Sequence, residues 1–331
     1  MKEREETDDS VSDGAPRADY APAGTENESP TLFATLKRTV SEFQEDNMTD
    51  WAAALTYYAL LSLFPALIAL VSIVGIFGDP QSTTKTITDI VREIGPESSA
   101  DTFSGPIESI TSNRSAAGIL LIVGIVGALY SASGYIGAYT RAANLIYETP
   151  EGRPFWKLKP LQILITLAMV IGLVLIAGGL ALSGPVVEAV ADPLGISNTA
   201  VTIWEIAKWP VLVVLFALML AFLNYATPNV KQRGFRVVTP GSLLALVLWI
   251  IVSIAFAVYV ANFGSYDKTY GTLGGLISLL VWMWITNVAI LFGVEFNSER
   301  ERAIQISEGV PRAESELQLE PRDPPDDPET T

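Results

Sequence analysis

The chain has 331 residues with a formal net charge of −15, and 50% of the residues are hydrophobic. It contains no cysteine and no histidine. Disulfides, thiolate metal sites and a histidine general base are therefore excluded, and we expect no metal site and no cofactor. Glycine-rich phosphate loops, nucleophile elbows and paired catalytic carboxylates are missing from the sequence, so we expect no catalytic residues and no enzyme.

The first predicted element is an acidic tail at residues 1–32. Residues 1–50 hold 13 acids and 5 bases, and few large apolar groups interrupt the stretch "EREETDDSVSDGAPRADYAPAGTENESP". Because such a segment buries too little apolar surface to offset its chain entropy, we predict that it is disordered. Its acidity has two interpretations. It either keeps exposed chain hydrated in a high-salt, halophilic habitat or provides a docking tail for a partner.

A membrane domain is predicted over residues 33–302. Six windows of 22 to 30 residues contain no Asp, Glu, Lys or Arg: 51–78, 115–140, 160–187, 209–230, 237–266 and 269–294. About 20 apolar residues span a bilayer core as a helix, and these windows lack the alternation of barrel strands. The prediction is an all-α, polytopic membrane protein, a bundle of six transmembrane helices at about 53–77, 116–138, 161–183, 209–227, 241–263 and 271–294.

The distribution of charge between these spans predicts their orientation. The two connections that follow the second and fourth spans hold seven bases and two acids, whereas residues 79–114 hold three bases and six acids. Lys and Arg accumulate on cytoplasmic connections. We therefore expect a multi-pass protein of the cell membrane with both termini in the cytoplasm.

The first span contains a proline, Pro65, in "AALTYYALLSLFPALIALVSIVGIFG". A proline inside a helix removes one backbone hydrogen bond and kinks the helix. Tyr58 lies in the half of the span that precedes the kink. Two interpretations stay open, a simple kink or a broken helix whose freed backbone groups bind a substrate.

A segment after the second span, "SASGYIGAYTRAANLIYETPEGRPFWKLK", marks the point where the chain leaves the membrane. Helical spacing continues past Arg141 until Pro150 stops the helix. Arg141 and Asn144 belong either to an interfacial elbow or to a cytoplasmic mouth of a cavity. Aromatic and basic side chains near the headgroups anchor such an elbow to lipid, and we assign this role to Trp156, Lys157 and Lys159.

The last span places Asn287 deep in the membrane and Glu295 at its inner end. A polar group in hydrocarbon is costly unless it is paired, so Asn287 should face protein or water. Glu295 is expected to pair with a base such as Arg141 or Arg236. After this span, residues 299–331 hold 10 acids and 4 bases, and residues 303–331 are predicted to form a second disordered acidic tail.

Three segments carry a family resemblance: "AAALTYYALLSLFPALIAL", the segment from 131 to 157, and "YGTLGGLISLLVWMWITNVAILFGVEFNSE". Together they resemble the YihY/BrkB family of inner-membrane proteins, formerly labelled ribonuclease BN. The resemblance covers roughly residues 33–302 and implies six spans in the cytoplasmic membrane, without implying an established activity. The positions that match the family motifs are Tyr58, Pro65, Ser133, Gly134, Asn144, Tyr147, Arg153, Pro154, Tyr270, Gly271, Gly293, Glu295 and Asn297.

Two functions fit these features. The preferred one is a transporter-like or flippase-like protein for a lipid or small solute, because polar groups lie at the helix ends and the first span is kinked. The alternative is a non-transporting scaffold or envelope-integrity protein that acts through its tails. Ribonuclease activity is disfavoured because the chain lacks histidine and a cluster of acids able to hold two metal ions. Membrane lipids are the expected partners and nucleic acid is not. A homo-oligomer is left open.

Overall fold

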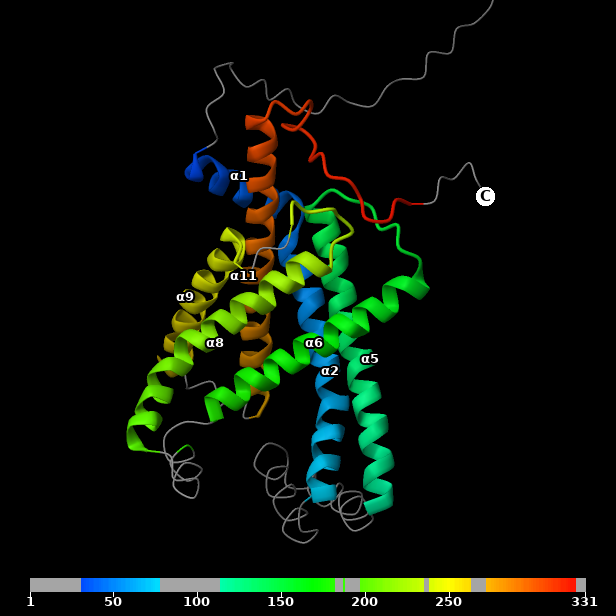
Figure 1. Cartoon of the computed structure of the whole chain (residues 1–331), viewed down its shortest axis with the longest axis vertical. Helices are drawn as coiled ribbons and strands as arrows, with labels where there is room; N and C mark the ends of the chain where they lie inside the picture. The colour runs from blue at the N-terminus through cyan, green and yellow to red at the C-terminus, as the bar shows by residue number, and fades with distance from the viewer. Residues whose placement is uncertain are drawn as a thin grey trace, which may run out of the picture.

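The fold is a bundle of long helices (Figure 1). The computed structural model describes residues 31–77, 114–181, 187, 197–234, 238–262 and 272–325. Over these residues the helices are α1 (Leu32–Glu45), α2 (Met48–Phe77), α5 (Arg114–Ile146), α6 (Phe155–Ala181), α8 (Asn198–Ala226), α9 (Pro240–Asn262) and α11 (Thr272–Ser307). The described residues form no strand, only one isolated antiparallel bridge between Val230 and Pro321.

Five of the described helices are long and apolar enough to cross a membrane. They are Ile122–Ile146, Phe155–Leu180, Asn198–Ala226, Pro240–Val260 and Gly275–Ser307, which correspond to the second to sixth predicted spans. Large apolar side chains on their outer faces are exposed, such as Val174 at 64% and Ile254 at 60%. Faces of this kind are stable against lipid rather than water. The predicted all-α, polytopic membrane architecture is confirmed.

The first predicted span, 53–77, coincides with α2. The side chains of α2 are described only as far as Ser62, so the total of six spans stays a prediction. Pro65 lies within the helical backbone of α2, but its side chain is outside the described residues, as are Tyr270, Gly271 and Arg236.

Helix α11 packs against α9, α2, α1 and α5, whereas α6 packs against α5 and α8. Helix α2 lies along α5, and α11 packs against both α9 and α2, while α6 and α8 run obliquely to these helices (Figure 1). Helix α1 lies beside the last turns of α11, and its N-terminus is capped by the Thr31 hydroxyl, which accepts a hydrogen bond from the Ala34 amide. The buried core includes Leu55, Tyr139 and Leu291.

One end of the bundle, at the top of Figure 1, carries buried ion pairs that join α1, the end of α5 and α11. We call it the polar end. It consists of α1, the connection 147–154 between α5 and α6, the connection 227–234 after α8, the last turns of α11, and residues 308–325, which we call the C-terminal strap.

The C-terminal strap corrects the prediction of disorder from residue 303 onward. Helix α11 continues to Ser307, and the strap then packs on the polar end with Ala313 only 1% and Leu317 only 5% exposed. The prediction was wrong for residues 303–325 because composition gives the number of charged residues but not the groups that they contact in the folded protein. Residues 1–30 lie outside the described part of the chain, so the N-terminal tail stays a prediction.

Candidate functional site: a central cavity below a buried polar network

Helices α2, α5, α6, α8, α9 and α11 line a partly open cavity of about 490 Å³, which we call the central cavity. Its lining is mostly apolar and includes no Asp, Glu, Lys or Arg. Representative lining residues are Ile136, Met169, Leu220, Trp249, Trp282 and Ile290. A cavity of this size and character falls in the range of ligand-binding pockets and suits a hydrocarbon chain.

Asn287 is the most polar side chain of this wall and joins three helices. The Tyr135 hydroxyl of α5 donates to Asn287 Oδ1 at 2.8 Å, and Asn287 Nδ2 donates to Thr56 Oγ1 of α2 at 3.1 Å. Asn287 is 4% exposed, so these bonds satisfy an amide that hydrocarbon would otherwise leave unsolvated. Asn287 therefore faces protein, as predicted, and lines the central cavity.

Above the cavity, the last turns of α11 carry a buried polar stripe. Its members are spaced by three or four residues and are at most 3% exposed: Glu295, Ser298, Glu299, Arg302 and Gln305. Residues at this spacing lie on one face of a helix. The stripe faces α5, α1 and the strap, as the contacts of Ser298, Glu299, Arg302 and Gln305 establish.

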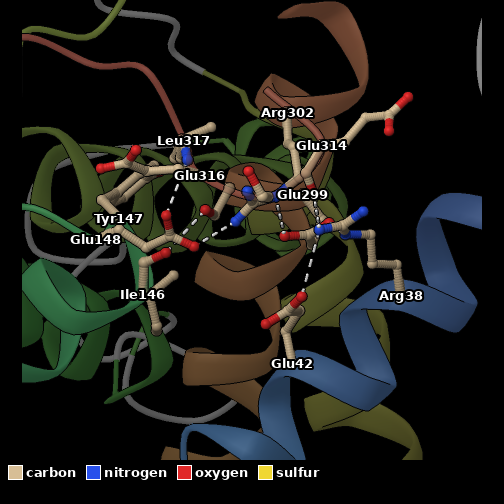
Figure 2. Close-up of polar contacts among 12 residues, drawn as sticks. Arg38, Glu42, Ile146, Tyr147, Glu148, Glu299, Arg302, Glu314, Glu316 and Leu317 are labelled. Atoms are coloured by element: carbon tan, nitrogen blue, oxygen red, sulfur yellow. Dashed lines mark hydrogen bonds and ion pairs between the residues drawn. The ribbon is translucent and has the colours of Figure 1, made fainter. Parts of the chain in front are cut away.

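A chain of ion pairs crosses this stripe, with Arg302 and Glu299 of α11 between Glu148 on one side and Arg38 of α1 on the other (Figure 2). The guanidinium of Arg302 contacts Glu148 Oε1 at 2.5 Å and Glu299 Oε1 at 2.9 Å. Arg38 Nε lies 2.6 Å from Glu299 Oε2. Buried charges of this kind depend on one another, because removing one leaves its partner unpaired.

Glu148 extends this chain of ion pairs to the C-terminal strap. Its backbone adopts a left-handed conformation, with φ of 50°, directly after α5. Its second carboxylate oxygen accepts a hydrogen bond from the Leu317 amide at 2.8 Å. One carboxylate thus fixes the end of α5 to both α11 and the strap.

A second cluster joins the two connections at the polar end. Arg153 makes a bidentate contact with Glu151, with both distances at 2.7 Å, and donates to the Thr227 carbonyl at 2.8 Å. Asn144 Nδ2 donates to Glu151 Oε2 at 3.0 Å, while its Oδ1 accepts from the Asn229 amide at 2.7 Å. The connections 147–154 and 227–234 are therefore held together by side chains that are largely buried.

The strap closes over this second cluster. Asn229 Nδ2 donates to the carbonyl of Asp323 at 2.7 Å and of Pro150 at 2.9 Å, and the Asp323 amide donates back to Asn229 Oδ1 at 3.0 Å. Arg322 donates to the Val230 carbonyl at 2.9 Å. These bonds satisfy backbone groups of the strap, which explains its order despite its acidity.

The carboxyl groups at the polar end differ in their pKa. Burial acts to raise the pKa of Glu151, but hydrogen bonds from Arg153 and its positive charge outweigh burial and lower this pKa. The pKa of Glu42 is raised, first by burial and then by the nearby charge of Glu299. The pKa of Asp46 is raised for the same kind of reason, burial first and then Glu148.

The residues selected from the sequence fall into separate places. Asn144, Arg153 and Glu295 lie at the polar end and Asn287 at the central cavity. Arg141 is exposed. Glu295 is 2% exposed and makes no ion pair among the described residues, so the predicted pairing of Glu295 with Arg141 is wrong. Arg141 is exposed, whereas Glu295 is buried in the α11 stripe.

Tyr58 and the predicted interfacial residues Trp156, Lys157 and Lys159 have different surroundings. The ring of Tyr58 lies so close to Gly134 of α5 that a Cβ there would be 3.0 Å from Tyr58 Cδ1, which makes Tyr58 a packing residue. Trp156 is 75% exposed, and its interfacial position stays a prediction. Lys157 reaches Asp323 of the strap at 3.5 Å, whereas Lys159 turns to Ser133 of α5.

Sequence reasoning missed several partners at the polar end, namely Arg38, Glu148, Glu151, Asn229, Glu299, Arg302 and the strap. The spacing of Glu295, Glu299 and Arg302 was a signal, because it continues one helical face beyond the last charge-free window. The described residues contain no cluster of three or more His, Cys, Asp or Glu arranged to hold a metal ion.

These features define an α-helical, polytopic membrane protein. The chain belongs to the family described as virulence factor BrkB, whose family model matches residues 39–317. It is 32% identical over 264 residues to the ribonuclease-like protein YfkH of Bacillus subtilis, covering 80% of this chain and 94% of that relative.

Two other relatives are named UPF0761 membrane proteins. The one from Aeromonas salmonicida is 26% identical over 260 residues, which cover 77% of this chain and 84% of the relative. The one from Alkalilimnicola ehrlichii is 29% identical over 266 residues, which cover 77% of this chain and 55% of the relative. No solved structure matches the chain. The resemblance seen in the sequence motifs is thus confirmed at the level of the family.

Proposed function

We propose that this protein moves a lipid across the membrane and is not an enzyme. The observation that carries the proposal is the central cavity of about 490 Å³, which six helices line with mostly apolar side chains. A charge-free wall offers no counter-ion, so a hydrocarbon chain fits it better than a charged solute. The hydroxyl and amide groups of Tyr135, Thr56 and Asn287 already bond one another, which supports a positioning role rather than chemistry.

The proposed location is the cell membrane, with the polar end in the cytoplasm. The segments 141–159 and 231–236, which hold seven bases and two acids, support this orientation under the positive-inside rule. Both termini would then be cytoplasmic, since α1 and the strap belong to the polar end. A scaffold that acts through free tails has less support, because residues 308–325 are packed against the protein.

The test is a lipid-translocation assay on the full chain in proteoliposomes. Fluorescent phospholipid is placed in both leaflets, and dithionite bleaches only the label that reaches the outer leaflet. Ala132→Phe fills the central cavity from α5, whereas Ala168→Phe adds the same bulk on the exposed surface of α6. We expect translocation by the wild type and by Ala168→Phe, and its loss in Ala132→Phe. Equal rates in empty and protein-containing vesicles would overturn the proposal.

A further inference from the structure

Lys159, near the start of α6, makes an unusual set of contacts. Its ammonium donates to Ser133 Oγ of α5 at 2.6 Å and lies 4.4 Å from the ring centroid of Tyr130. Ser133 Oγ in turn donates to the Tyr130 carbonyl at 2.6 Å. A lysine ammonium has three donors, and Ser133 occupies one of them. Both partners are neutral, so they orient the positive charge without neutralising it.

The ammonium lies beside an apolar part of α5. Tyr130 and Ser133 both belong to the charge-free window 115–140. Ser133 is seven residues before the end of that window, which corresponds to about 10 Å along a helix. An ionised side chain at such a position is costly, and in membrane proteins it commonly marks a substrate or ion site.

The surroundings leave this charge open to a ligand. No carboxylate of the described residues lies within ion-pair distance of Lys159, and Tyr130 is 62% exposed. The neighbouring Lys157 differs, because it is 58% exposed and pairs with Asp323 at 3.5 Å. Lys157 therefore has a protein counter-ion, while the partners of Lys159 among the described residues, Ser133 and Tyr130, are neutral.

We propose that Lys159, held by Ser133 and Tyr130, binds the phosphate of a phospholipid. The phosphate supplies the anion that the protein does not, through charge-assisted hydrogen bonds to the remaining ammonium protons. This site deepens the proposed function, on which it rests, because it names phosphate-bearing lipids as the substrate class. In this arrangement Lys159 recognises the headgroup on α5 and α6, two of the helices that also line the central cavity.

Photolabelling of the full chain in phosphatidylcholine nanodiscs tests the site. One probe is a photoactivatable phosphatidylglycerol, and the other is a diacylglycerol with the same chains and no phosphate. For the wild type we expect labelling by the phosphatidylglycerol probe to exceed that by the diacylglycerol probe roughly tenfold. Lys159→Gln should abolish this preference, Lys159→Arg should retain it, and Lys231→Gln, which removes a lysine paired with Glu320, should leave it unchanged.

Several results would overturn the site. Equal labelling of the wild type by both probes would contradict the site. This comparison needs no variant, so it remains valid if Lys159→Gln fails to fold. Unchanged labelling of a folded Lys159→Gln protein would also contradict the site. Displacement of the phosphatidylglycerol probe by millimolar inorganic phosphate would show a free-anion site instead of a lipid site. Labelling requires no translocation, so this result and the translocation assay can fail independently.

Discussion

Gly241 of α9 and Gly293 of α11 bring two helix backbones into direct contact. A Cβ built on Gly241 would lie 2.0 Å from the Gly293 carbonyl oxygen, and one built on Gly293 would lie 2.4 Å from the Gly241 carbonyl oxygen. Small residues allow such close approach between membrane helices. Asn297 secures the crossing, since its Oδ1 accepts from the Gly241 amide at 2.9 Å and its Nδ2 donates to Thr239 Oγ1 at 3.0 Å.

Gly293→Ala should separate these helices, because the added methyl group collides with backbone that cannot rotate away. We expect a loss of about 1–3 kcal/mol in the free energy of unfolding, measured by denaturant titration in mild detergent. Gly275→Ala is the matched control on the same helix, since nothing lies within 4 Å of its Cβ. There alanine should be neutral or stabilising by up to about 1 kcal/mol. Equal effects at both positions would contradict the close crossing.

Arg302→Gln should destabilise the polar end strongly. The change leaves Glu299 and Glu148 without their shared guanidinium, and both Arg302 and Glu299 are 2% exposed. A loss of about 3–5 kcal/mol is expected from breaking a buried pair. Arg300→Gln provides the control on α11, because Arg300 makes no ion pair with any described residue. Thermal unfolding in detergent should separate the two variants, and similar curves would show that the ion pairs contribute little.

Gly152→Val should detach the C-terminal strap from the polar end. A Cβ on Gly152 would lie 2.1 Å from the Asp323 carbonyl oxygen, so the strap has no room beside a larger residue. We expect faster hydrogen–deuterium exchange at the amides of Leu317 and Asp323, which the protein now protects by hydrogen bonds. Gly178→Val is the control, with nothing within 4 Å of the added carbon. Unchanged exchange in Gly152→Val would mean that the strap is not held there.

Glu151 and Glu42 should respond to pH in opposite directions. The pKa of Glu151 is lowered from 4.5, so its contribution to stability is complete above about pH 4.5 and is lost as pH falls through the lowered value. The pKa of Glu42 is raised from 4.5, so its contribution is complete below that pH and declines as pH rises.

Substitution by glutamine tests these signs through unfolding measured between pH 3 and 8. Glu151→Gln should lower stability at pH 7, with a deficit that shrinks toward pH 3. The stability of Glu42→Gln relative to the wild type should be highest near pH 8, because the stabilising contribution of the wild-type carboxyl declines as pH rises. Identical pH profiles for the wild type and Glu151→Gln would show that the contact with Arg153 does not stabilise the charged carboxylate.

The predictable parts of the structure were those governed by the bilayer. Charge-free windows such as 160–187 and 237–266 became α6 and α9, because a lipid environment requires internal backbone bonding whatever the partner helix. Asn287 was correctly expected to face protein for the same reason. The pairing of Glu295 with Arg141 was a guess about which side chains meet, and helical spacing alone does not define the rotation of one helix against another.

The sequence by itself determined that this is a polytopic helical membrane protein. Long stretches without ionic groups are most stable in lipid, and the α-helix satisfies their backbone hydrogen bonds in that environment. Tertiary structure decided which polar groups meet: Asn229 with Asp323, Glu148 with Arg302, and Lys159 with Ser133. It also decided that the acidic residues between 308 and 325 form an ordered strap. The physical reason is that pairing between distant polar groups depends on helix packing, whereas partition into lipid depends only on local composition.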